Sequence, residues 1–182
     1  MDAVQRLGLS ALIGGAGLVV ANVLLVLNPD ARDFDAVGDY LAVGVLAAAV
    51  LLTLAGLVGV HLRQRDSYGR LGRVGMLLAL VGEAAVGVAS VRLNEWVFLV
   101  TAVTGLVGFV LLAVAIARAP ALPHWSGFLL LVGFVALFAV GDGDFGIALS
   151  GVVWLVIGYA LRSGWTETAP AARPLQARPL QP

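Results

Sequence analysis

The amino-acid sequence predicts an all-α, polytopic membrane protein: a compact bundle of six transmembrane helices with both termini in the cytoplasm. Composition is the first observation, because 60% of the 182 residues are hydrophobic and only 12% are charged. Soluble domains average about 45–50% apolar and about 25% charged residues. Six apolar segments of membrane-spanning length are the second observation, and the uneven placement of the arginines between them is the third.

Each of the six segments comes close to the roughly 20 apolar residues that a transmembrane helix needs. They cover approximately residues 7–27, 40–62, 71–91, 96–116, 122–140 and 145–161. We therefore expect one membrane domain, residues 1–162. The first segment has an alternative interpretation as a cleaved signal peptide, but its apolar run is longer than the 7–15 residues typical of one, and no clear cleavage motif follows. We interpret it as a retained span.

The arginines predict the orientation, because cytoplasmic loops are enriched in positive charge. With the N-terminus inside, only Arg32 and Arg92 lie outside. The other nine are cytoplasmic: Arg6, Arg63, Arg65, Arg70, Arg73, Arg118, Arg162, Arg173 and Arg178. Arginine without lysine, together with abundant Ala, Val, Gly and Leu, is typical of a high-GC prokaryotic genome. The expected location is the plasma membrane of a prokaryote, with several passes through the bilayer.

The C-terminal segment differs in composition from the rest. Residues 163–182 read "SGWTETAPAARPLQARPLQP", with "ARPLQ" repeated. Such a Pro-rich, polar segment is too poor in apolar residues to pack, so we predict a disordered cytoplasmic tail.

Glycine is frequent within the spans, at spacings that let helix backbones approach closely in lipid. The glycines expected at helix–helix contacts are Gly14, Gly15, Gly17, Gly56, Gly59, Gly105 and Gly108.

The segment "RAPALPHWSGFLLLVG" (118–133) places a basic residue, "LP", a Trp and a Gly at the start of an apolar span. In this loop and in its six-span layout the chain resembles small six-helix membrane proteins of bacteria. The resemblance implies the six-span layout and no particular activity.

Glu83 is the main candidate for a functional residue, because it lies near the middle of the third span. A charge at that depth costs about 2.5–3.5 kcal/mol, so such residues face the bundle interior and find partners. The third and fourth spans form a hairpin in which position 104 is level with position 83. We therefore predict an intramembrane polar cluster of Glu83, Thr104, Thr101 and Asn22, in which the carboxyl group is protonated because its charged form would lose its hydration.

Two hypotheses explain Glu83. In one, a neutral Glu83 joins helices by hydrogen bonds. In the other, it gains and loses a proton and couples proton or cation movement to transport. No Arg or Lys lies deep in another span to pair with it, which favours the neutral form.

Two histidines are the remaining candidates. His61 and His124 lie at the cytoplasmic edge at similar depth, and two imidazoles are a ligand pair for haem or a metal. Ordinary placement at the membrane interface is the alternative, because b-type haem ligands usually lie deeper.

Catalytic motifs are not found. The chain has no cysteine, which excludes disulfides and thiolate chemistry. It also contains no phosphate-binding loop, dinucleotide fingerprint or zinc-protease motif. We therefore expect no cofactor, no metal, no nucleic-acid partner and no enzyme activity. The favoured hypothesis is a non-catalytic membrane subunit or scaffold in contact with the lipid bilayer and with a protein partner or a second copy of itself. The alternatives are a small proton- or cation-coupled transporter that uses Glu83 and an enzyme or haem-binding redox protein.

Overall fold

The computed structural model describes residues 1–28, 37–89, 95–119, 121–139 and 145–164. In these ranges the regular structure is helical throughout. The helices are α1 (Ala3–Leu27), α2 (Val37–Gln64), α3 (Gly69–Ala89), α4 (Glu95–Ala117), α5 (His124–Ala139) and α6 (Gly146–Ser163). The prediction of an all-α fold with six helices is confirmed. Nearly all of the segment predicted to be a disordered tail lies outside the described residues.

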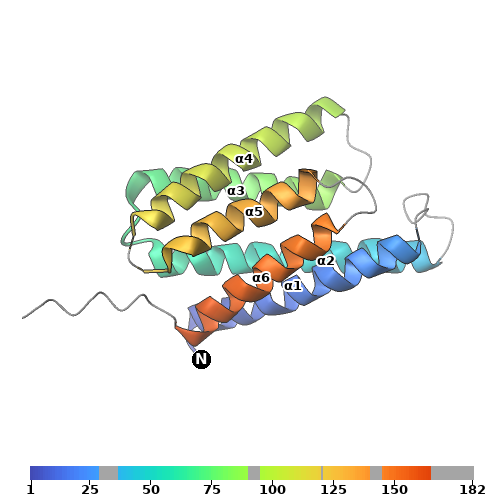
Figure 1. The fold of residues 1–182 in the computed structure, drawn as a ribbon, viewed down its shortest axis with the longest axis horizontal. Coiled ribbons are helices and arrows are strands. Elements are labelled where there is room, and N and C mark those ends of the chain that lie inside the picture. Colours follow the sequence, from blue (N-terminus) through green and yellow to red (C-terminus); the bar gives the residue numbers. More distant parts are fainter. Residues whose placement is uncertain (29–36, 90–94, 120, 140–144, 165–182) are drawn as a thin grey trace, which may run out of the picture.

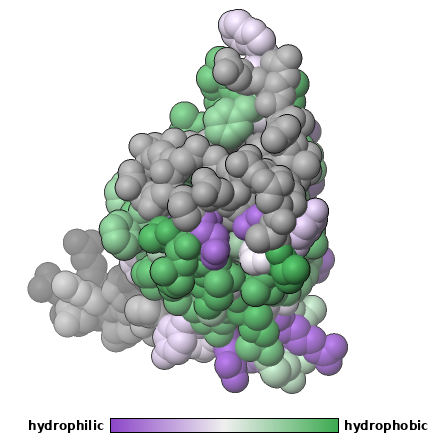
Figure 2. Space-filling view, turned by 90° about the vertical axis from the view of Figure 1, so that its right-hand side faces the viewer, coloured by the Kyte–Doolittle hydropathy of each residue, from purple (hydrophilic) through white to green (hydrophobic). Residues whose placement is uncertain are grey.

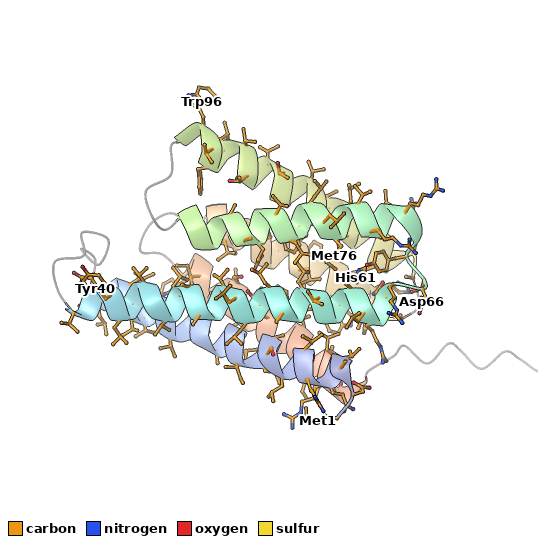
Figure 3. All side chains as sticks on the ribbon, turned by 180° about the vertical axis from the view of Figure 1, so that it is seen from behind. Met1, Tyr40, His61, Asp66, Met76 and Trp96 are labelled. Atoms are coloured by element: carbon orange, nitrogen blue, oxygen red, sulfur yellow. The ribbon has the colours of Figure 1, made fainter. Side chains whose placement is uncertain are left out.

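The helices form two groups of three, with α1, α2 and α6 in one and α3, α4 and α5 in the other (Figure 1). Each helix packs on its neighbour in the chain, and α6 returns to pack on α1, so the contacts form a closed ring. The start of α1 and the end of α6 lie at the same end of the bundle, together with the α2–α3 turn (Figure 1). We call this the inner end, because the placement of the arginines predicts that it faces the cytoplasm. Opposite it, α4 diverges from the bundle towards Trp96 (Figure 3).

The lengths and composition of the helices are those of a membrane protein. Within the described ranges four helices are long and apolar enough to cross a bilayer, namely α1, α2, α4 and α6, while α5 contains a shorter apolar stretch. Helix α3 is not among the four; it carries Arg70, Arg73 and Glu83. Many large hydrophobic side chains are exposed. Figure 2 looks onto the end of the bundle opposite the inner end, and much of the described surface there is hydrophobic. Lipid is the solvent that such a surface fits.

Local interactions define the helix ends at the inner end. Asp2 and Gln5 form a capping box, in which each side chain accepts a hydrogen bond from the backbone N–H of the other residue. Helix α6 ends at Gly164, whose left-handed conformation (φ 67°) suits glycine. The guanidinium group of Arg63 donates to the carbonyl oxygens of Ala121 (3.5 Å) and Gly164 (3.3 Å). Arg63 therefore connects the end of α2 to the start of α5 and the end of α6.

Glycine makes the closest helix contacts, as predicted. Gly15 of α1 and Gly151 of α6 face each other so closely that a Cβ atom on either would lie 2.6 Å from the other's carbonyl oxygen. Gly82 of α3 meets Gly105 of α4 in the same way. Gly56 of α2 meets α1 at Ala11 and would, with a Cβ, also meet Trp154 of α6. Because lipid provides little hydrophobic force between helices, this close packing holds the bundle together.

Candidate functional site

The carboxyl group of Glu83 lies in the interior, where the two groups of helices meet. Its residue is 2% exposed. Oε1 lies 3.2 Å from the hydroxyl oxygen of Thr53 on α2, and the indole of Trp154 on α6 lies beside the same carboxyl group. Glu83 of α3 therefore joins its own helix to two helices of the other group.

The Thr53 hydroxyl group indicates the protonation state of this contact. Oγ1 of Thr53 also lies 2.8 Å from the carbonyl oxygen of Val50, one turn earlier in α2. A hydroxyl group carries one hydrogen and accepts through two lone pairs. When that hydrogen is donated to Val50, the 3.2 Å contact with Glu83 is a hydrogen bond only if the carboxyl group supplies the proton. The geometry therefore suits a neutral Glu83 that donates to Thr53 and lies beside the Trp154 indole.

The partners of Glu83 differ from those that the sequence suggested, although the hairpin register agrees. Gly82 faces Gly105, and Gly75 faces Leu112, in the same register as position 83 opposite position 104. However, Gly82 occupies the face that contacts α4. Successive residues of an α-helix are about 100° apart, so Glu83 points away from α4 and towards α2 and α6.

The other residues of the predicted cluster are engaged elsewhere. The hydroxyl group of Thr104 donates to the carbonyl oxygen of Val100 at 2.7 Å. Oγ1 of Thr101 also bonds within α4, where it lies 2.8 Å and 2.9 Å from two carbonyl oxygens that share its single hydrogen. Asn22 is buried, and its side-chain oxygen accepts from the backbone N–H of Ala148 at 3.2 Å. Asn22 therefore joins α1 to the first turn of α6, and the hydrogen bonds described for these three residues go to groups other than Glu83.

The sequence analysis did not connect either Thr53 or Trp154 with Glu83. A signal for Thr53 was present. The turn between α2 and α3 is centred near Asp66 and Ser67, so the hairpin argument places position 50 level with Glu83. Thr53 is less than one turn from that position and is the polar residue of that stretch. Trp154 had no comparable signal, because α6 is not the chain neighbour of α3.

Two further polar side chains in the interior have no partner among the described residues. The amide group of Gln64, at the end of α2, is completely buried, and so is the hydroxyl group of Ser150 on α6. Ser150 precedes Trp154 by one helical turn, so both lie on the same face of α6. The sequence analysis did not single out either residue.

The two histidines occupy different surroundings at the inner end. Nδ1 of His61 is hydrogen-bonded to the hydroxyl group of Tyr68, and the two rings meet edge to face. Burial raises the pKa of the Tyr68 phenol, and the positive charge of Arg73 opposes this shift. His124 is the first residue of α5 and is exposed. The described residues contain no group of three or more His, Cys, Asp or Glu side chains able to hold a metal ion.

Comparison with known proteins does not identify a family. No protein-family model matches the chain, and no curated protein or solved structure is significantly similar to it.

Proposed function

We propose that the protein is a non-catalytic subunit or scaffold of a prokaryotic plasma membrane, with six spans and both termini in the cytoplasm. The observation that carries this proposal is the enclosure of Glu83. Its carboxyl group is buried, and its two partners, Thr53 and Trp154, come from two other helices. A carboxyl group used in this way fixes the arrangement of three helices.

A second buried polar contact also joins two helices. Asn22 joins α1 to α6. Close glycine contacts join α1 to α2, α1 to α6 and α3 to α4. These contacts fix how the helices pack on one another, which suits a protein whose task is to present its lipid-facing surface and its loops to a partner. In this proposal the partner is another protein or a second copy of the chain.

A specific observation also favours the second candidate, a proton- or cation-coupled transporter. Glu83 lies where the two groups of three helices meet, and α2 and α3 touch less extensively there than α3 and α4 do. Movement of one group against the other would change the surroundings of the carboxyl group. An intramembrane acid at such a position is the usual carrier of a coupled proton.

The substitution Glu83→Gln distinguishes the two functions. An amide keeps the shape and the donor to Thr53, but it does not titrate. We expect the variant to melt close to the parent in detergent, because membrane hydrogen bonds average only about 0.6 kcal/mol. In proteoliposomes containing a pH-sensitive dye, we expect neither protein to move protons faster than empty vesicles.

Proton flux by the parent that is lost in a normally folded Glu83→Gln protein would overturn the scaffold proposal and support the transporter. A control variant, Thr104→Val, removes a hydroxyl group that bonds only within α4. It should match the parent in both measurements.

A further inference from the structure

The contact between α2 and α3 differs from the other contacts between chain neighbours. The glycines of α2 that meet another helix, such as Gly56 and Gly59, face α1 and α6. Those of α3 that do so, Gly75 and Gly82, face α4. Larger side chains therefore separate α2 from α3, and the surface between the two helices remains open.

This opening is a groove of about 280 Å³. We call it the α2–α3 groove; its lining residues are Val58, His61, Arg73, Met76, Leu77 and Leu80. Met76 is buried and forms part of its floor, whereas Leu77 is 65% exposed at its rim. His61 and Met76 lie between the two helices when the bundle is seen from behind (Figure 3). The groove therefore opens on the lipid-facing flank of the bundle.

The walls of the groove are apolar almost throughout, and the two polar residues of its lining, His61 and Arg73, stand at one end of it. His61 and Arg73 are level with each other near the inner end. Leu80 lies two turns deeper along α3, which is about 10 Å at 1.5 Å per residue. A groove of this shape fits the hydrocarbon chain of a lipid whose polar headgroup lies at His61 and Arg73.

The charge at the polar end selects the headgroup. Arg73 is exposed, and no ion pair to it occurs in the part of the chain that the structure describes. Arg70, also exposed, lies one turn earlier on α3. His61 uses Nδ1 to bond Tyr68, which leaves Nε2 as its other polar atom. These groups complement a phosphate, which planar guanidinium groups bind well.

We propose that the α2–α3 groove binds an anionic glycerophospholipid, with the phosphate at Arg73 and one acyl chain along Val58, Leu77 and Leu80. The site belongs to the inner end of the bundle. Basic pockets between transmembrane helices on the cytoplasmic side are where anionic headgroups bind. This inference requires the membrane location but neither of the two candidate functions.

The test compares two lipids with identical acyl chains, phosphatidylglycerol and phosphatidylcholine, added to the purified protein in detergent. Native mass spectrometry counts the bound lipids, and a melting curve measures stabilisation. We expect phosphatidylglycerol to bind more tightly and to raise the melting temperature further. Arg73→Gln should weaken phosphatidylglycerol binding about fivefold, because one basic residue near an anionic lipid contributes about that factor, and should leave phosphatidylcholine unchanged.

Two variants control for charge and for shape. Arg118→Gln removes an exposed arginine at the same end of the bundle but outside the groove, and it should retain parental affinity. Val58→Phe keeps every charge but fills the groove, and it should weaken both lipids. Both positions are exposed, so the variants should fold.

Equal binding of the two lipids, or an Arg118→Gln loss as large as that of Arg73→Gln, would overturn the proposal. Soluble glycerol phosphate provides a further arm. Glycerol phosphate should fail to displace the lipid at equal concentration. If it displaces the lipid effectively, the site binds phosphate without any role for the acyl chain, and the proposal is wrong.

Discussion

Oγ1 of Thr53 lies 3.2 Å from Oε1 of Glu83 and 2.8 Å from the carbonyl oxygen of Val50. The single hydrogen of the hydroxyl group cannot serve both oxygens fully, and the shorter distance favours Val50. When the hydroxyl hydrogen is donated to Val50, the proton of the interhelical contact comes from Glu83. The Thr53–Glu83 contact joins α3 to α2. It lies on the side of α3 opposite to the Gly82–Gly105 contact with α4.

Replacing Thr53 by valine tests this contact. The substitution keeps the side-chain shape and removes the acceptor for the Glu83 proton. We expect a loss of about 0.6 kcal/mol in the free energy of unfolding, with about 1.7 kcal/mol as the upper end for membrane hydrogen bonds. The control is Thr101→Val, since that hydroxyl group donates only to carbonyl oxygens of α4. Equal losses for the two variants would show that the Thr53–Glu83 contact contributes nothing.

Infrared spectroscopy tests the proton itself. The difference spectrum between the parent and Glu83→Gln should contain the C=O stretch of a protonated carboxylic acid at neutral pH. Thr53→Val should shift that band, because the acid loses its acceptor. A carboxylate band in its place would contradict the neutral form.

Two glycines provide a matched test of helix packing. At Gly15 a Cβ atom would lie 2.6 Å from the carbonyl oxygen of Gly151 and 2.8 Å from the backbone nitrogen of Leu155. Because backbone atoms cannot yield as a side chain can, Gly15→Ala should destabilise the bundle by about 1–3 kcal/mol. At Gly44 a Cβ atom meets nothing within 4 Å, so Gly44→Ala should be neutral or stabilise by up to about 1 kcal/mol. Unfolding in detergent measures both, and a tolerated Gly15→Ala would contradict the close approach of α1 and α6.

The Tyr68 hydroxyl group makes a pH-dependent contribution. Tyr68→Phe removes its hydrogen bond to His61 and should cost about 1 kcal/mol. Burial raises the pKa of the phenol in the folded protein, so the neutral form is favoured by folding. Its contribution is complete below the unfolded pKa of about 10 and is lost as the pH rises through the higher folded pKa.

Melting curves between pH 8 and pH 11 check this expectation. The parent should lose stability relative to Tyr68→Phe at the alkaline end. The control is Tyr159→Phe, because Tyr159 is 60% exposed on α6 and should behave like the parent throughout. A difference between the parent and Tyr68→Phe that does not change with pH would rule out ionisation of the phenol as the cause.

The topology is tested by reporter fusions. In the six-span arrangement a reporter after Asp35 lies outside and one at the C-terminus lies inside, so an enzyme active only in the periplasm should report the first and not the second. The bundle supports this expectation, because α1 begins and α6 ends at the same end (Figure 1). Matching signals from the two fusions would mean that the number of spans is wrong.

The sequence by itself determined the class of protein and the relation between α3 and α4 along their axes. Long apolar segments predict helices because a backbone in lipid must satisfy its own hydrogen bonds. The short "RLNE" connection set position 83 level with position 104, and the contacts of Gly82 with Gly105 and of Gly75 with Leu112 follow that register. Glu83 stood out because an acid in such a segment is rare.

Only the tertiary structure decided which way Glu83 points and what it meets. A soluble helix shows its buried face through an apolar stripe, but these helices are apolar on nearly all sides, so the sequence does not reveal their rotation. The close approach of Gly82 to Gly105 sets the rotation of α3. Because Gly82 occupies the face of α3 that contacts α4, the neighbouring residue Glu83 points towards Thr53 and Trp154. Trp154 reaches it because α6 closes the ring, a contact between segments far apart in the chain.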